Sequence, residues 1–286
     1  ISACFDSNEN KILVAYSNGG DSNQGYAIVG EVDPSDNSIA FGTHEEFYNN
    51  TVYGIETAFN TQYNTVGILY GNESNHPNFV TAKIDSGATT ITFGSELEIN
   101  ETTTGEARSL GVCFYDVTGS RHWVVVYRGA SDYLYTNCIS YDGTTLTLNA
   151  QTNLKKFDGS NTTGEFAKVV FVPSISDGLG GDDGNHVIYV YNRGGVTGVA
   201  VVGEISGTSI THVHAKESIF TQGWNVGGSS QAHHIGVVWN TSRKKLIISY
   251  TDNDPSNYVN IVEGQMLPGG RLSKVIFSGE RNLLSE

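Results

Sequence analysis

The chain has 286 residues, of which 34 are Gly, 5 are Pro and 1 is Met, and its formal net charge at pH 7 is −14. An acidic surface repels phosphate backbones and anionic lipid headgroups, so we expect neither nucleic-acid binding nor membrane insertion. No segment keeps the 3.6-residue apolar period of a helix, whereas strand formers and turn residues are abundant. The composition therefore predicts an all-β protein.

Five apolar runs that end in Tyr recur along the chain. They are Lys11–Tyr16, Thr65–Tyr70, His122–Tyr127, His186–Tyr191 and Lys244–Tyr250. The successive tyrosines lie 54, 57, 64 and 59 residues apart. A repeat of this length, made only of strand-like segments, is typical of one propeller blade. We predict a single five-bladed β-propeller domain, with blades at about 1–50, 51–104, 105–162, 163–226 and 227–286.

Each repeat is predicted to contain four antiparallel strands. The first strand ends at an aromatic residue, such as Phe5 or Trp239, and the Tyr-ending run is the second. Because the second strand is apolar at nearly every position, we expect neighbouring blades to cover both its faces. A tight turn, such as Ser86-Gly87, joins the third strand to a fourth that alternates apolar and polar residues. Stacking the five blades in a ring is expected to bury both faces of each blade.

Metal and cofactor binding receive little support from the sequence. The three cysteines lack the paired spacing of a zinc site or a disulfide framework. His212 and His214 would share a strand face, but no third ligand accompanies them. Asp182 and Asp183 are weak candidates for Ca²⁺, without the EF-hand pattern. We expect no metal and no cofactor.

The first repeat contains a series of structural motifs. They are an aromatic-Asp pair, a Lys, an Ala-Tyr pair, Gly-x-Ala-x-Val-Gly and Ile-x-Phe-Gly-Thr, found at Phe5-Asp6, Lys11, Ala15-Tyr16, Gly25–Gly30 and Ile39–Thr43. Parts of the pattern return at Ile91–Ser95 and Ala200–Gly203. The repeat resembles that of virion structural and tail-fibre-like proteins of marine bacteriophages. The resemblance implies a setting, a virion appendage or another surface-exposed protein, and no particular chemistry.

Polar loops are predicted to gather on one rim of the propeller. The loops between second and third strands are rich in Asp, Asn, Gly and Arg, and the crossings between blades add aromatic residues. Carboxylates and amides can bond sugar hydroxyls, and an aromatic ring can stack on a sugar. Gly and Asn are also ordinary turn residues, so part of this pattern follows from the turns alone. The predicted ligand-binding residues are Tyr53, Arg128, Asp132, Arg193, Trp224, Asp252 and Asp254.

Glycoside hydrolysis is the alternative chemistry for such a ring. It needs two carboxylates that flank the scissile bond. Glu56, Glu106 and Glu165 lie near the entries to first strands and are the candidates for the central funnel. Solvated surface carboxylates are the simpler explanation, because no Asp-box, Gly-x-Ser-x-Gly or His-Glu-x-x-His motif is present.

The sequence leaves three functions open. The favoured one is a non-catalytic recognition or structural module of a virion appendage or extracellular assembly, and hence not an enzyme. Its partner would be a host-surface glycan or a neighbouring structural subunit, and its location extracellular or on a virion surface. The alternatives are a glycoside hydrolase with acidic residues in the funnel, and a purely structural domain that binds only neighbouring proteins.

Overall fold

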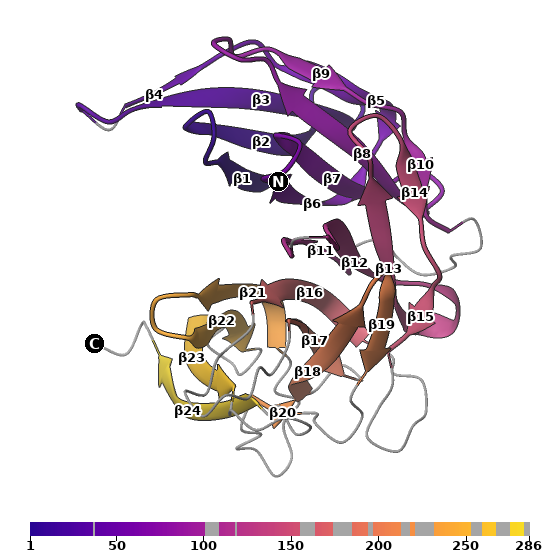
Figure 1. Cartoon of the computed structure of the whole chain (residues 1–286), viewed down its shortest axis with the longest axis vertical. Coiled ribbons are helices and arrows are strands. Elements are labelled where there is room, and N and C mark those ends of the chain that lie inside the picture. The colour runs from indigo at the N-terminus through magenta and orange to yellow at the C-terminus, as the bar shows by residue number, and fades with distance from the viewer. Residues whose placement is uncertain are drawn as a thin grey trace.

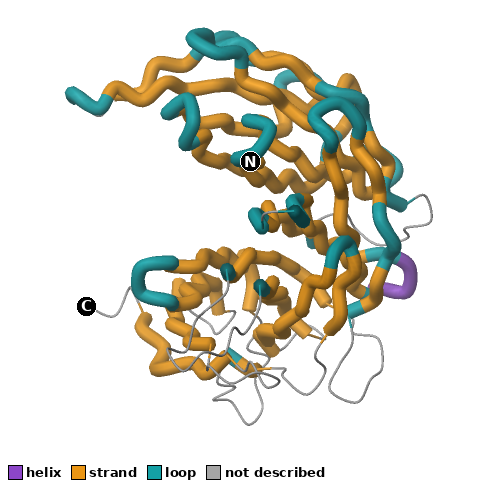
Figure 2. Tube along the Cα trace, in the orientation of Figure 1, coloured by secondary structure: helices purple, strands orange, loops and turns teal. Residues whose placement is uncertain are grey.

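The computed structural model describes most of the chain, in residues 1–36, 38–100, 109–117, 119–154, 164–173, 185–193, 197–212, 218–220, 232–252, 259–266 and 275–282. In this part of the chain strands dominate, and the helical content is the short 3-10 turn η1 (Ala130–Asp132) (Figure 2). None of the described helical segments is long and apolar enough to cross a bilayer. The all-β prediction is confirmed.

The strands form five antiparallel sheets, one for each repeat, so the molecule is a five-bladed β-propeller as predicted. Blade 1 contains β1 (Ser2–Asp6), β2 (Lys11–Asn18), β3 (Gln24–Asp33) and β4 (Ser38–Phe41). Blade 2 contains β6 (Tyr53–Asn60), β7 (Thr65–Gly71), β8 (Pro77–Ile84) and β9 (Ile91–Phe93). Blade 3 contains β11 (Leu110–Tyr115), β12 (His122–Arg128), β13 (Leu134–Tyr141) and β14 (Leu146–Leu148). Blade 4 contains β16 (Gly164–Val172), β17 (His186–Arg193), β18 (Thr197–Ser206) and β19 (Ser209–His212), and blade 5 contains β21 (Ala232–Asn240), β22 (Lys245–Asp252), β23 (Val259–Met266) and β24 (Val275–Asn282).

The first four sheets each gain a fifth strand that the sequence did not predict. These strands are β5 (Glu45–Thr51), β10 (Leu97–Glu98), β15 (Thr152–Asn153) and β20 (Ser218–Ile219), and each pairs with the third strand of its own sheet. In blade 1, β4 pairs with Gly30–Asp33 of β3, and β5 pairs with Gln24–Ala27 on the rest of the same strand. The crossing segment therefore satisfies backbone groups that the short fourth strand leaves unpaired.

The five blades lie on an arc around a common centre, with the first and last blades at its two ends (Figure 1). The innermost strands β1, β6, β11, β16 and β21 contact one another in chain order. Apolar clusters fill the four interfaces between successive blades, and the second strands contribute to all of them. In β7 every residue is buried, which confirms the prediction that the apolar second strands are covered on both faces inside the stack.

The expectation that the ring buries both faces of every blade is wrong for blade 1, and also for blade 5, where Val238 is 53% exposed. The side chains of Phe5 and Phe41 are 50% and 55% exposed, and Ile39 is 43% exposed. Ile91 holds the place of Ile39 in blade 2 and is 9% exposed, because it faces blade 1. No described segment packs on the equivalent face of blade 1.

The cysteines and one hairpin turn illustrate the local structure of the blades. The three cysteines are free: Cys113 and Cys138 are buried and Cys4 is half-buried. Burial raises the pKa of the Cys4 and Cys138 thiols to about 12, so both stay protonated at neutral pH. The turn that joins β8 to β9 has Gly87 at a φ of +70°, a conformation that side chains other than Gly rarely adopt.

Candidate functional site

The centre of the propeller is a funnel whose wall has the same register in every blade. One residue of each innermost strand pairs with the residue that precedes the recurrent Tyr of the second strand. Because the register is shared, these five residues occupy one layer of the funnel wall. In chain order they are Ser2, Glu56, Gly111, Lys168 and Gly236.

This layer contains an ion pair between blades that are not neighbours in the chain. The Lys168 ammonium of β16 donates to Glu56 Oε1 of β6, and also to the backbone oxygen of Leu110 at 3.2 Å. The side chains of Glu56 and Lys168 are both about three-quarters buried. A Cβ at Gly111 would lie 2.7 Å from the Cα of Lys168, so glycine is needed for β11 and β16 to approach this closely. The sequence analysis predicted Glu56 in the funnel and missed Lys168.

Above this layer two strands bulge into the funnel mouth. The register of β16 shifts between Glu165 and Lys168, and that of β21 shifts between His233 and Gly236. Within the bulges, Phe166 and His234 have φ values of +53° and +50°. A bulky residue in this left-handed region is strained, and such strain clusters at functional sites.

The two bulge residues lie against each other. The ring centroids of Phe166 and His234 are 5.7 Å apart, and the Phe166 N–H donates to Ser109 Oγ at 2.9 Å. In a regular strand the adjacent residues His233 and His234 would point to opposite faces, so the sequence gives no reason to expect a joint role for them. The bulge interrupts that alternation at His234.

A cavity of about 590 Å³ opens where these features meet. Residues of all five innermost strands line it, among them Ser2, Glu56, Phe166, Lys168 and His234. The cavity therefore combines a carboxylate, an ammonium group, an imidazole and an aromatic ring. A concave space in which several polar and charged groups converge beside an aromatic ring can hold a small molecule.

A second charged group lies on the adjoining rim. Arg128, at the end of β12, contacts Asp132 Oδ1 at 2.6 Å and Glu165 Oε1 at 3.2 Å. Tyr53 and Arg193 belong to the same rim, because they pair with Gly71 and Gly164 at the corresponding strand ends. The structure thus brings together Arg128, Asp132 and Glu165, and it places Tyr53 and Arg193 at the corresponding strand ends.

The side chains of the other predicted site residues lie outside the described part of the structure. Asp252 ends β22, but its side chain is not described. Glu106, Asp182, Asp183, His214, Trp224 and Asp254 lie outside the described residues. Among the residues that are described, no group of three or more His, Cys, Asp or Glu side chains is arranged to hold a metal ion.

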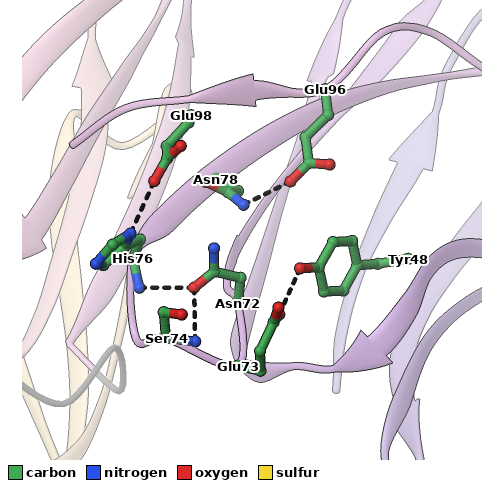
Figure 3. A network of polar contacts seen from close by, with 8 residues as sticks. All are labelled: Tyr48, Asn72, Glu73, Ser74, His76, Asn78, Glu96 and Glu98. Carbon is green, nitrogen blue, oxygen red and sulfur yellow. Dashed lines mark hydrogen bonds and ion pairs between the residues drawn. The ribbon is translucent and has the colours of Figure 1, made fainter. Parts of the chain in front are cut away.

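The rim loop between β7 and β8 forms a separate polar network (Figure 3). Asn72 Oδ1 accepts the backbone N–H groups of Ser74 at 3.0 Å and His76 at 2.9 Å. His76 contacts Glu98 at 2.7 Å, and Tyr48 donates to Glu73. Burial and the Glu73 carboxylate raise the pKa of Tyr48 above its ordinary value. These bonds hold the loop to its own blade through Asn72 and His76, and to blade 1 through Tyr48 of β5. The polar residues of the loop are therefore explained by loop structure.

The funnel residues that the sequence analysis missed had a usable signal. Aligning the five first strands on their terminal aromatic residue places Lys168 level with Glu56, and two glycines at the same level. Two opposite charges and two glycines at one level indicate that the charged side chains share the limited space between closely spaced strands. The bulge at His234 has no comparable signal, because bulges depend on the pairing register.

No protein-family model matches the sequence, and no curated protein matches it. The fold, in contrast, matches many solved structures. The periplasmic gluconolactonase of Pseudomonas aeruginosa superposes with a TM-score of 0.68 and 11% identity, over 99% of this chain and 72% of that one. A provisional 6-phosphogluconolactonase from Bacteroides uniformis ATCC 8492 gives a TM-score of 0.65 at 8% identity, over 98% and 71% of the two chains. A GH43 glycoside hydrolase, engineered for endo-xylanase and exo-arabinofuranosidase activity, gives a TM-score of 0.50 at 9% identity, over 96% and 51%.

These comparisons correct the expectation that the protein is not an enzyme. That expectation treated a propeller without recognised catalytic motifs as a recognition module. The same fold, however, is found in lactonases and in a glycoside hydrolase that act on sugar derivatives. Identities of 8–11% establish the fold alone. The chemistry must therefore be argued from the funnel itself.

Proposed function

We propose that the protein is a hydrolase that opens the cyclic ester of a sugar acid in the central funnel. The observation that supports this proposal most is the Glu56–Lys168 pair, held between blades 2 and 4 at the base of a cavity of about 590 Å³. Lactone hydrolysis is an acyl transfer to water. It needs a base for the water and a positive group for the oxygen that becomes negative.

Lys168 is suited to bind the lactone carbonyl oxygen. An ammonium group has three N–H donors, and Lys168 uses two of them on Glu56 and on the Leu110 backbone oxygen. The third is available to a substrate oxygen in the cavity. As water attacks the carbonyl carbon, negative charge develops on that oxygen, and a fixed ammonium stabilises it more strongly than bulk water does.

Glu56 is suited to act as the base. Its carboxylate lies beside Lys168, so a water bonded to Glu56 lies close to a carbonyl bonded to Lys168. Water oxygen forms the new C–O bond while Glu56 takes one of its protons. When the ring C–O bond breaks, the proton passes from Glu56 to the ring oxygen, which becomes a hydroxyl, and the product is the open-chain sugar acid.

The funnel mouth supplies the binding surface. The Phe166 ring offers an apolar face for the C–H side of a sugar ring, and His234 beside it offers a hydrogen-bonding group. Arg128 at the rim suits a charged or carboxylate-bearing substituent of the substrate. We propose that the protein acts outside the cytoplasm, supported by the expected extracellular setting and by the periplasmic location in the name of one fold neighbour. The virion setting and the host-glycan partner stay predictions.

Hydrolysis of glucono-δ-lactone by the purified protein tests the proposal. The rate is followed by pH-stat, with the spontaneous rate subtracted. Glu56→Gln is expected to lower kcat/KM by roughly 10²–10⁴-fold, and Lys168→Met by roughly 10²–10³-fold. Glu98→Gln is the matched control, because Glu98 also contacts a basic side chain but lies on β10, outside the funnel. Activity that survives both funnel substitutions would contradict the proposal.

Glycoside hydrolysis is the second candidate, favoured by the fold of the GH43 enzyme and by two carboxylates, Glu56 and Glu165, on separate funnel strands. It ranks lower because it requires two carboxyl groups that flank one bond, whereas Glu165 contacts Arg128 at the rim and is not among the residues that line the cavity. Release of reducing sugar from arabinoxylan measures it. Glu165→Gln separates the two candidates: it should abolish glycosidase activity but spare the lactonase chemistry assigned to Glu56 and Lys168.

A further inference from the structure

The outer face of blade 1 is as apolar as an interface between blades. Alternate residues of its four strands point to this face, because their blade 2 equivalents point toward blade 1. The face includes Phe5, Ile12, Val14, Ile28, Val32, Ile39 and Phe41. Most of these side chains are large and aliphatic or aromatic, which is unusual for a surface that meets water.

A comparison of equivalent positions in blades 1 and 2 indicates that this face of blade 1 has the composition of a buried interface. Val14 of β2 is half-buried, whereas its equivalent Ile68 of β7 is fully buried. Ile28 of β3 is also half-buried, and its equivalent Val80 of β8 is 2% exposed. The residues are of the same kind in both blades. The difference is that blade 1 covers the face of blade 2, and nothing described covers the face of blade 1.

The opposite end of the arc presents the complementary face. In blade 5, Val238 is 53% exposed, and Ile247 and Ile261 are half-buried. In blade 1 the equivalent of Ile247 is Leu13, and the equivalent of Ile261 is Ala27. Both of these blade 1 residues face blade 2 and are 0% exposed. The arc therefore ends in the two kinds of face that meet at each of its internal interfaces (Figure 1).

We propose that these two faces dock a pair of further blades of this same repeat, which close the propeller between blade 5 and blade 1. The fold neighbours indicate the number. The Pseudomonas lactonase matches 99% of this chain with 72% of its own, so it is longer by roughly 110 residues, or about two repeats of the length found here. The Bacteroides protein gives the same proportion. A second copy of the chain and direct contact between blades 1 and 5 are the competing occupants.

The test compares the 286-residue chain with an extended chain in which residues 1–104 are repeated after residue 286, which adds two blades in the right order. Each is made with and without Val14→Glu, and circular dichroism and light scattering give Tm and mass. We expect the extension to raise Tm by roughly 5–10 °C. We also expect Val14→Glu to shift the Tm of the 286-residue chain by less than about 3 °C, and to remove most of the gain in the extended chain.

The equivalent substitution in blade 2, Ile68→Glu, is the control and should be severe in both chains. If it prevents folding, the milder pair Val14→Ala and Ile68→Ala replaces it. Three outcomes would overturn the proposal. In the first, the extension leaves Tm unchanged. In the second, Val14→Glu is as harmful as Ile68→Glu in a monomeric 286-residue chain, which would mean that blade 5 already covers the face. In the third, the chain forms a dimer that Val14→Glu dissociates, which would mean that a second copy is the occupant.

Discussion

The interface between blades 2 and 3 and the outer face of blade 1 are made from the same kind of strands, yet only the first is a core. Trp123 is completely buried in the interface, between Phe79 and Phe114. Phe5, which holds the position of Phe114 in blade 1, is half exposed. The comparison shows that each repeat has apolar blade faces in its own sequence, and that such a face becomes part of a buried core only where a neighbouring blade covers it.

Replacing Trp123 should strongly destabilise the interface between blades 2 and 3. Its ring packs against three aromatic rings within 5.1 to 5.8 Å, and its Nε1 donates to the Ala58 backbone oxygen at 3.2 Å. Trp123→Ala leaves a large cavity and an unpaired carbonyl oxygen. We expect the free energy of unfolding to fall by about 3–5 kcal/mol, measured by urea denaturation. Phe5→Ala, on the exposed face, should cost less than about 1 kcal/mol, and equal costs would contradict the comparison.

The same comparison explains which parts of the fold could be predicted. The period and the strands follow from local patterns, because each Tyr-ending run is apolar in its own sequence. The exposed face of blade 1 could not be predicted, since Ile12 and Val66 look alike until their neighbours are known. The funnel was predicted in part: Glu56 was named, but Lys168 was missed because the first strands were not aligned on their terminal aromatic residues. The left-handed bulge at His234 depends on pairing and had no local signal.

The buried residue that begins the second strand offers a comparison between blades 1 and 3. In blade 1 it is Lys11, whose ammonium donates to the Ala88 backbone oxygen at 2.5 Å. In blade 3 it is His122, stacked on Tyr115 with ring centroids 4.8 Å apart. Burial lowers the pKa of His122 to about 4, from about 6.5 for an exposed imidazole. The folded protein therefore holds His122 neutral where the unfolded chain would protonate it.

This pKa shift predicts a loss of stability in acid. Above pH 6.5 both states are neutral at His122 and the residue has no pH effect. As the pH falls from 6.5 toward 4, the unfolded chain binds a proton that the folded protein excludes, and the free energy of unfolding falls by up to about 3 kcal/mol. His122→Phe, which keeps a ring on Tyr115, should lose this slope. Urea denaturation at pH 7 and pH 4.5 measures the effect, and parallel pH dependence in both proteins would argue against it.

The smallest expected effect concerns two glycines, one in the funnel and one on the exposed face. A Cβ at Gly111 would lie 2.7 Å from the Lys168 Cα, a backbone atom that moves only if β11 and β16 separate. A Cβ at Gly30 would lie 2.6 Å from Ile39 and 2.9 Å from Phe41, both exposed side chains that can turn into solvent. Gly111→Ala should therefore lower the free energy of unfolding by about 1–3 kcal/mol, whereas Gly30→Ala should change it by less than about 0.5 kcal/mol.

The glycine pair also tests whether the funnel depends on close strand approach. Because Lys168 holds Glu56, moving β16 away from β11 should weaken that contact as well as the packing. Gly111→Ala is thus expected to lower lactone hydrolysis along with stability, while Gly30→Ala lowers neither. Equal loss of stability from the two substitutions would mean that the face of blade 1 is packed as firmly as the funnel wall, and that the difference between the two regions does not exist in solution.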